Sequence, residues 1–144
     1  MNKRIIQVVV LVLSLSICTL ANINIGFKLV LGGSILPTVS LGYEHESGHG
    51  IEITTGVLPG GKYKFLLRGE LGYTYRYKNL KVGLGRGITR YGAETIPFFD
   101  DHFKLSYLIP IKNQSFVDIG STVSLGVSSQ GIAFWGGVNK QYNP

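Results

Sequence analysis

The pattern in this sequence that could most directly do chemistry is a histidine two residues before a serine, His45 and Ser47. A histidine within hydrogen-bond reach of a serine hydroxyl can take its proton, and the serine can then attack an acyl carbon. This chemistry also needs an acidic side chain that orients the histidine. The glycine-rich segment Ser47-Gly48-His49-Gly50 overlaps the pattern and favours a simpler interpretation, the polar end of a hairpin.

Two other patterns concern metal and phosphate binding. Asp100, Asp101 and His102 carry oxygen and nitrogen groups that can ligate metals. Adjacent residues of a strand point to opposite faces, so these three side chains do not converge easily, and we expect an exposed acidic loop end. Gly83-x-Gly85-x-Gly87 suggests a phosphate-binding loop, but its third glycine is misplaced for a dinucleotide-binding loop and no helix follows it. We therefore expect glycines that relieve crowding inside a barrel. The sequence therefore predicts no metal and no cofactor.

The elements that must position these residues are strands, because apolar residues alternate with small or polar ones after residue 21. Eight such runs are separated by turns rich in glycine, proline, asparagine and serine, and the last run, over 132–138, is the weakest. The one long connection is expected from about Gly87 to His102, on the outer side. We therefore predict an all-β fold over residues 22–144, an eight-stranded antiparallel up-and-down barrel of the transmembrane type.

The longest run, from Tyr63 to Tyr77, indicates which face of this barrel meets lipid. Aromatic residues stand at both ends of its apolar face, and the span from Phe65 to Tyr75 corresponds to about 25 Å along a membrane normal. A narrow eight-stranded interior holds glycine, serine and threonine more easily than so many aromatic rings. The predicted membrane-facing aromatic girdle comprises Tyr43, Tyr63, Phe65, Tyr73, Tyr75, Tyr77, Phe103 and Tyr107.

The opposite face is small and carries charges of both signs, and buried charges need partners. We predict an ion-pair network that plugs the lumen, so that the barrel does not conduct. The predicted network comprises Lys28, Glu44, Glu52, Arg68, Glu70, Lys81, Lys104 and Asp118. The alternative is a soluble periplasmic barrel that binds an apolar ligand, with its charges in water and with Tyr63, Leu67, Leu71 and Tyr75 facing inward.

Residues 1–21 have the three parts of a secretory signal peptide. Lys3 and Arg4 precede an uncharged apolar run, and Thr19-Leu20-Ala21 places small residues at the cleavage positions. A permanent membrane helix needs about 20 apolar residues, which is more than this run has. We therefore predict cleavage after Ala21 and delivery to the outer membrane by its assembly machinery. The alternative is lipidation of Cys18, the only cysteine, although bulky Ile17 precedes it.

The formal net charge is +6, but the basic residues are spread along the strands. Nucleic-acid binding needs basic residues clustered on one face, so we expect no nucleic-acid partner. Arg86 and Arg90 flank or occupy the long connection together with Phe98-Phe99. A basic and aromatic rim of this kind suits anionic lipid headgroups or anchoring at the membrane interface. Membrane lipid is therefore the expected partner, and the sequence names no partner protein.

The pattern and size of the chain after residue 21 resemble the small eight-stranded outer-membrane barrels of the OmpA/OmpX type. The resemblance implies an outer-membrane protein with a structural or surface-interaction role. The chain departs from these barrels at its end, Lys140-Gln141-Tyr142-Asn143-Pro144, where they often end in an aromatic residue. The spacing of His45 and Ser47 is similar to that in lipid A deacylases, which are also eight-stranded barrels, so a lipid-modifying barrel enzyme is the alternative function.

Overall fold

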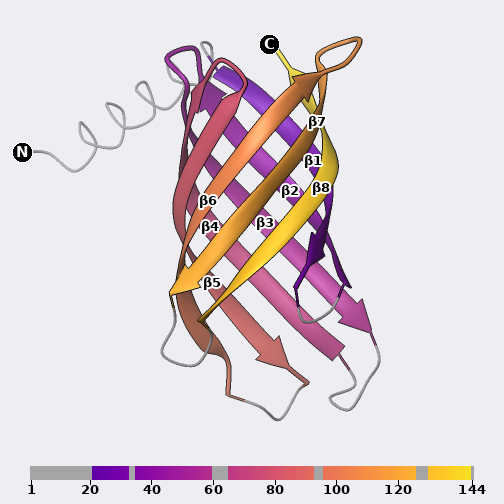
Figure 1. Ribbon diagram of the computed structural model, residues 1–144, viewed down its shortest axis with the longest axis vertical. Coiled ribbons are helices and arrows are strands. Elements are labelled where there is room, and N and C mark those ends of the chain that lie inside the picture. The colour runs from indigo at the N-terminus through magenta and orange to yellow at the C-terminus, as the bar shows by residue number, and fades with distance from the viewer. Residues whose placement is uncertain (1–20, 33–34, 60–64, 93–95, 126–129, 144) are drawn as a thin grey trace, which may run out of the picture.

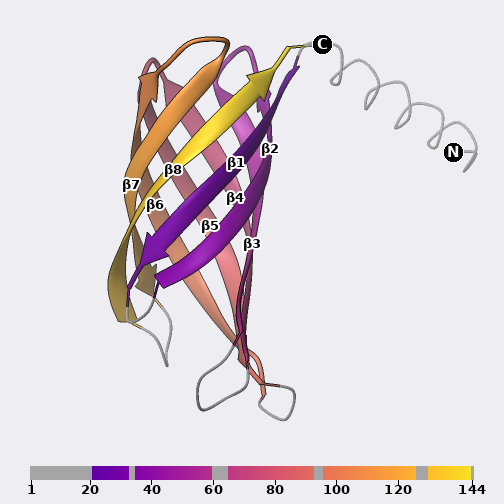
Figure 2. The same ribbon diagram turned by 90° about the vertical axis from the view of Figure 1, so that its right-hand side faces the viewer.

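The computed structural model describes residues 21–32, 35–59, 65–92, 96–125 and 130–143 (Figure 1). Each strand is antiparallel to its neighbours in sequence, and β8 pairs with β1, so the sheet closes into a barrel (Figure 2). The eight strands are β1 (Ala21–Leu31), β2 (Ile35–His45), β3 (His49–Pro59), β4 (Phe65–Tyr77), β5 (Leu80–Tyr91), β6 (Phe98–Pro110), β7 (Ser115–Leu125) and β8 (Gln130–Tyr142). The predicted eight-stranded antiparallel barrel is confirmed, and the weak last run closes it.

Two sets of expectations lie outside this part of the chain. The predicted signal peptide, with Cys18, falls almost wholly within residues 1–20, and Tyr63 belongs to the segment between β3 and β4. Among the described residues, no helix is long and apolar enough to cross a membrane.

The barrel has two unlike ends (Figure 1). The terminal end carries the start of β1, the end of β8 and the three short turns after β2, β4 and β6. The loop end is the opposite end, where β1, β3, β5 and β7 end. These two names are kept below.

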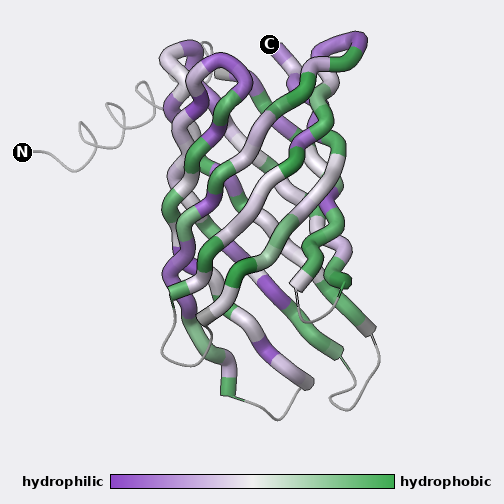
Figure 3. Tube along the Cα trace, in the orientation of Figure 1, coloured by the Kyte–Doolittle hydropathy of each residue, from purple (hydrophilic) through white to green (hydrophobic). Residues whose placement is uncertain are grey.

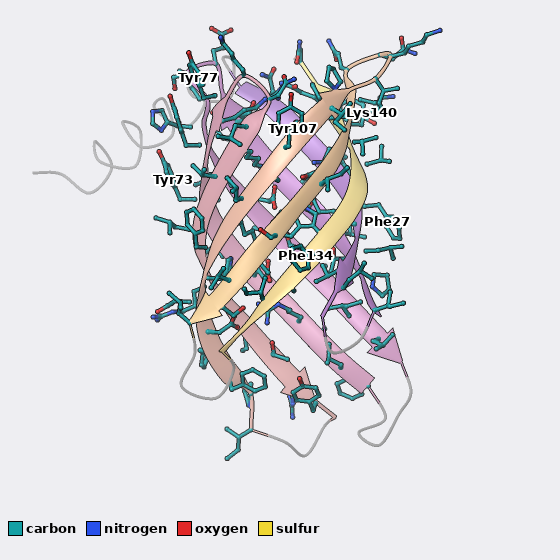
Figure 4. The ribbon with its side chains drawn as sticks, viewed as in Figure 1. Phe27, Tyr73, Tyr77, Tyr107, Phe134 and Lys140 are labelled. Carbon is teal, nitrogen blue, oxygen red and sulfur yellow. The ribbon has the colours of Figure 1, made fainter. Side chains whose placement is uncertain are left out.

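Side chains of each strand alternate between the outer wall and the lumen, because successive residues of a strand point to opposite faces. In β2, Val39 and Leu41 are exposed on the outer wall, while Thr38 and Ser40 are buried. Figure 3 shows the same alternation as a change of hydropathy along the strands, and Figure 4 shows labelled aromatic residues such as Phe27 and Phe134 on the outside. The apolar face of the barrel is therefore its exterior.

This orientation contradicts the alternative of a soluble barrel with an apolar interior. Three of the four residues that would have to face inward, Leu67, Leu71 and Tyr75, are exposed on the outer wall. The fourth is Tyr63, which is not among the described residues.

The long connection between the fifth and sixth runs was placed wrongly. β5 continues to Tyr91 and β6 begins at Phe98, so most of the expected loop is paired strand, with Gly87 opposite Asp100 and Arg86 opposite Asp101. The alternation was hard to read here because Arg86 and Asp101 place charges on the otherwise apolar outer face.

Two glycines are required by close approaches of the backbone. Gly48 lies in the turn after β2 with a φ of 88°, and a Cβ there would stand 2.1 Å from the carbonyl oxygen of Arg76. Gly120 faces the lumen beside Trp135, and a Cβ there would stand 2.4 Å from the indole ring. The first glycine closes a turn at the terminal end, and the second makes room for the largest side chain of the lumen.

Candidate functional site: the charged lumen

The centre of the lumen holds a cluster of charges around Glu52 and Asp118. Glu52 accepts hydrogen bonds from Lys28, at 3.3 Å, and from Lys81, at 2.5 Å. Lys28 also pairs with Asp118 at 2.9 Å, so a single ammonium joins two carboxylates from different strands. These groups are buried, and pairing offsets the cost of removing them from water.

Asp118 is fully buried and receives two further hydrogen bonds. Trp135 donates its indole N–H at 3.2 Å, and Asn139 donates from its amide at 2.8 Å. The Lys28 ammonium also lies 5.6 Å from the centre of the Trp135 ring, within range of a cation–π contact. Both oxygens of Asp118 are therefore occupied, which satisfies a carboxylate that has no access to water.

A second cluster lies nearer the loop end and is built around Arg68. Its guanidinium makes a two-bond pair with Asp100, at 2.9 and 3.2 Å, and donates to Glu70 at 2.7 Å and to Thr89 at 2.8 Å. A planar guanidinium suits such bidentate recognition of a carboxylate. Lys104 pairs with Glu70 and lies 4.0 Å from Glu52, so it links this cluster to the central one.

Among the described residues of this cluster, His102 is the one buried side chain that has a nitrogen without a hydrogen-bond partner. Its Nε2 lies 4.0 Å from Glu70, and its buried Nδ1 has no hydrogen-bond partner. Gly85 faces the same ring, and a Cβ there would stand 2.8 Å from Nε2. This glycine relieves crowding beside the imidazole.

A smaller cluster lies toward the terminal end. Arg76 pairs with Glu44 at 3.4 Å, donates to Gln141 at 3.4 Å, and lies 4.6 Å from the centre of the Phe116 ring. Across the described lumen the charges balance, since each of the two signs contributes five groups. The cations are Lys28, Arg68, Arg76, Lys81 and Lys104, and the anions are Glu44, Glu52, Glu70, Asp100 and Asp118.

The network predicted from the sequence contained eight of these ten charges but lacked several of their partners. Asp100 and His102 were expected in an exposed loop; that expectation is wrong, because both are buried side chains of β6. Trp135 and Asn139 were also missed, although the alternation of β8 places both on the face opposite Phe134. Extending the period of two through the ends of the runs would have found all four.

The lumen toward the loop end holds a cavity of about 260 Å³. Lys28, Arg68, Glu70, Lys104 and Trp135 lie at its inner end, and four threonines surround it, Thr38, Thr54, Thr89 and Thr122. Apolar side chains line it closer to the strand ends, namely Val30, Leu36, Leu66, Tyr91, Phe98 and Ala133. The cavity is therefore charged at its inner end and apolar toward the loop end.

The outer wall carries the aromatic residues singled out in the sequence. Tyr73, Tyr75, Tyr77, Phe103 and Tyr107 are exposed on it, and Figure 4 shows Tyr73, Tyr77 and Tyr107 pointing away from the barrel in its upper part. Tyr43 and Phe65 are half-buried.

An ion pair interrupts this wall. Arg86 and Asp101 lie opposite each other on β5 and β6 and form an exposed ion pair of 2.7 Å. Arg90, two outward positions beyond Arg86, is half-buried. The three residues Asp100, Asp101 and His102 are thus divided between the two faces. No group of three or more potential ligands is placed to hold a metal among the residues that the structure describes.

His45 and Ser47 lie at the turn after β2 and contact each other. His45 Nδ1 is 2.8 Å from Ser47 Oγ, and it also accepts a hydrogen bond from the Ser47 backbone N–H at 3.2 Å. The Gly48 N–H donates to the His45 carbonyl at 2.8 Å, which closes the turn. Within the described chain, no carboxylate accepts a hydrogen bond from His45.

Comparison with known proteins places the fold. No family model and no curated protein matches the chain. Among solved structures, the N-terminal β-barrel domain of Pseudomonas aeruginosa OprF matches with a TM-score of 0.66 and 11% identity, over 84% of this chain and 97% of that one. The crystal structure of Yersinia pestis Ail, the attachment invasion locus protein, matches with a TM-score of 0.53 and 11% identity, over 85% and 96%.

A structure of the same outer membrane protein Ail in a phospholipid bilayer nanodisc gives a TM-score of 0.54, over 85% of this chain and 98% of that one. At 11% identity these likenesses concern the fold. The chain has the fold of the small eight-stranded outer-membrane barrels, as the resemblance in sequence pattern implied.

Proposed function

We propose that this protein is an integral outer-membrane barrel with a structural or surface-interaction role and a plugged lumen. The observation that carries the proposal is the inverted polarity of the barrel. Large apolar side chains cover the wall, Leu71, Leu84 and Phe99 among them, whereas charged side chains lie in the lumen. A soluble monomer rarely exposes an apolar patch of more than a few hundred Å², so lipid is the environment that suits this surface.

Strand geometry supports the same environment. A membrane excludes unpaired backbone groups, and a closed barrel satisfies them because it has no free edge. β1 pairs with both β2 and β8, so the sheet has no edge strand. The fold shared with outer-membrane proteins of two bacteria is consistent with this location.

The plugged lumen is supported by the network of ion pairs. Charged side chains from strands that do not pair with each other meet in the interior, as Lys28 of β1 and Glu52 of β3 do, and Lys104 of β6 joins them to Glu70 of β4. An eight-stranded barrel has an interior only just wide enough for side chains. Steady passage of ions would require these pairs to separate.

The location is tested by expressing the chain in a Gram-negative host and separating its membranes. The chain is expected in the outer-membrane fraction and in a folded form that migrates differently on gels before and after heating. Recovery in the soluble periplasmic fraction would contradict the proposal.

The plugged lumen is tested separately by adding the refolded barrel to planar phospholipid bilayers. No steady conductance steps are expected, while a water-filled porin in the same bilayer serves as the positive control. Regular steps that scale with the number of inserted barrels would show an open lumen and would leave the membrane location untouched.

A further inference from the structure

The charged inner end of the cavity near the loop end presents its cations and its carboxylates differently. Arg68, Lys104 and Lys28 reach its lining, whereas Asp100, Asp118 and Glu52 do not. The side chains of Arg68 and Lys104 are 19% and 18% exposed, and those of Asp100 and Asp118 are 0% exposed. Cations therefore face the cavity, and three of their carboxylate partners lie behind them.

Glu70 is the one acidic residue that lines the cavity among the described residues, and it is held from two sides. Arg68 donates to its Oε1, and Lys104 pairs with its Oε2. Both oxygens are thus engaged by cations. Four of the five Arg68 N–H groups donate to Glu70, Thr89 and Asp100, which leaves one N–H on Nη2. The Lys104 ammonium uses one of its three N–H groups on Glu70. An anion at the inner end would meet a guanidinium and an ammonium before it met a free carboxylate.

The rest of the cavity suits a short apolar chain. Side chains such as Leu36, Leu66 and Phe98 line it toward the strand ends, and the tyrosine ring of Tyr91 stacks on Phe98 with centroids 5.7 Å apart. A volume of 260 Å³ corresponds to roughly nine water molecules at about 30 Å³ each. A ligand of about that many non-hydrogen atoms would fill it.

We propose that the lumen binds a small anionic amphiphile, whose carboxylate or phosphate head meets Arg68 and Lys104 and whose short alkyl chain points toward the loop end. The ion network fills the lumen on the other side of the head, so the ligand enters and leaves from the loop end. The proposal requires only the barrel and goes beyond its role in the membrane. It rests on the proposed membrane barrel with its plugged lumen, and the location and conductance tests above check that barrel separately.

Trp135 allows a direct measurement because it is the only tryptophan in the chain and lines the cavity. The barrel is refolded into phosphatidylcholine vesicles and titrated with 2-bromohexanoate, whose bromine lies beside the carboxylate and quenches indole fluorescence on contact. Saturable quenching is expected. Hexanoate should reverse the quenching at about one tenth of the concentration that hexylamine needs. The carboxylate of hexanoate can accept hydrogen bonds from the two cations, whereas the ammonium of hexylamine cannot.

A matched pair of glycines on β8 supplies the control variants. An added Cβ at Gly131 or at Gly136 would meet no atom within 4 Å, but Gly131 lines the cavity, whereas Gly136 alternates with Trp135 and lies on the outer wall. Gly131→Leu is expected to abolish saturable quenching, and Gly136→Leu to leave it unchanged. Both variants add the same side chain to the same strand, so a general effect on the barrel would appear in both.

The outcomes separate the alternatives. Quenching that rises linearly and equally in both variants would mean that the probe merely dissolves in the bilayer, and it would overturn the proposal. Equal displacement by hexanoate and hexylamine would also overturn it, because the head would then play no part. Displacement by hexyl phosphate as well as by hexanoate assigns a general anion site, whereas displacement by hexanoate alone assigns a carboxylate site.

Discussion

Arg86 and Asp101 face each other on the outer wall of the barrel and share two hydrogen bonds, from Nε to Oδ1 at 2.7 Å and from Nη2 to Oδ2 at 3.2 Å. Their neighbours on the same face are apolar, since Leu84 and Ile88 flank Arg86 on β5 and Phe99 and Phe103 flank Asp101 on β6. An isolated charge on the lipid face of a barrel is destabilising. Pairing with Asp101 therefore allows this apolar wall to carry the Arg86 guanidinium.

The first prediction concerns this pair. Asp101→Leu leaves the Arg86 guanidinium alone among apolar side chains, so the barrel should unfold at a lower urea concentration than the wild type in phosphatidylcholine vesicles. The double variant Arg86→Leu/Asp101→Leu removes both charges and should be at least as stable as the wild type. A single variant as stable as the double one would mean that this part of the wall lies outside the apolar layer, among lipid headgroups.

The second prediction concerns the centre of the lumen. Asp118→Leu removes the carboxylate that accepts from Trp135 and Asn139 and pairs with Lys28. Breaking a buried ion pair on one side costs about 3–5 kcal/mol, so the free energy of unfolding should fall by that amount. Denaturant titration followed by the heat-dependent shift on gels measures it without relying on Trp135 fluorescence.

The double variant Lys28→Met/Asp118→Leu is the control for this second experiment. It removes the ammonium, which has lost one of its two carboxylate partners, along with the carboxylate, while Glu52 keeps Lys81 as a partner. It should therefore be more stable than Asp118→Leu alone. If the two variants are equally stable, Lys28 and Asp118 are not energetically coupled.

The third prediction compares two glycines that differ only in what surrounds them. Gly120→Ala places a methyl group 2.4 Å from the Trp135 ring and 2.6 Å from the Leu105 carbonyl oxygen, and such overpacking costs about 1–3 kcal/mol. Gly136→Ala meets no atom within 4 Å and should stabilise the barrel by about 0.4–1 kcal/mol through the unfolded chain. Unfolding in urea should show the two opposite signs; two losses of equal size would refute the packing described for Gly120.

The fourth prediction addresses the histidine and serine at the terminal end. His45→Ala removes the 2.8 Å contact with Ser47 but not the backbone hydrogen bond that closes the turn. We expect a small loss of stability, of about 1 kcal/mol or less, and no change in the acylation of lipid A in cells that express the variant. Ser47→Ala provides the matching removal of the other partner. A change in lipid A that wild-type expression causes and both variants abolish would instead establish a lipid-modifying enzyme.

The period-two alternation of the sequence was sufficient to predict the barrel and the face of most residues. Leu71 and Glu70 are an example: adjacent in the chain, they lie on the outer wall and in the lumen respectively. The pairing of charges could not be read in this way, because it depends on the stagger between strands. Lys28, for instance, reaches Asp118 across β8, which pairs with both of their strands.

The end of β5 and the start of β6, near residues 87–102, could not be predicted from the sequence for a different physical reason. Glycines at 83, 85 and 87 leave the middle of the lumen face of β5 without side chains, and Arg86 and Asp101 place charges on the outer face. Each departure weakens the contrast between the two faces on which the prediction relies. These residues form strands because β5 and β6 pair with each other in the folded barrel, and the local sequence pattern does not show this pairing.

The distribution of the ion network over the strands bears on how the barrel is assembled. Every strand contributes a member, from Lys28 on β1 to Asn139 on β8. Lys28 and Asp118 belong to the first and seventh strands, so their pair forms only when the sheet is nearly complete. A partly inserted sheet would hold these charges unpaired against hydrocarbon, which is unfavourable. Insertion and closure should therefore occur as one concerted step, with few half-built intermediates at equilibrium.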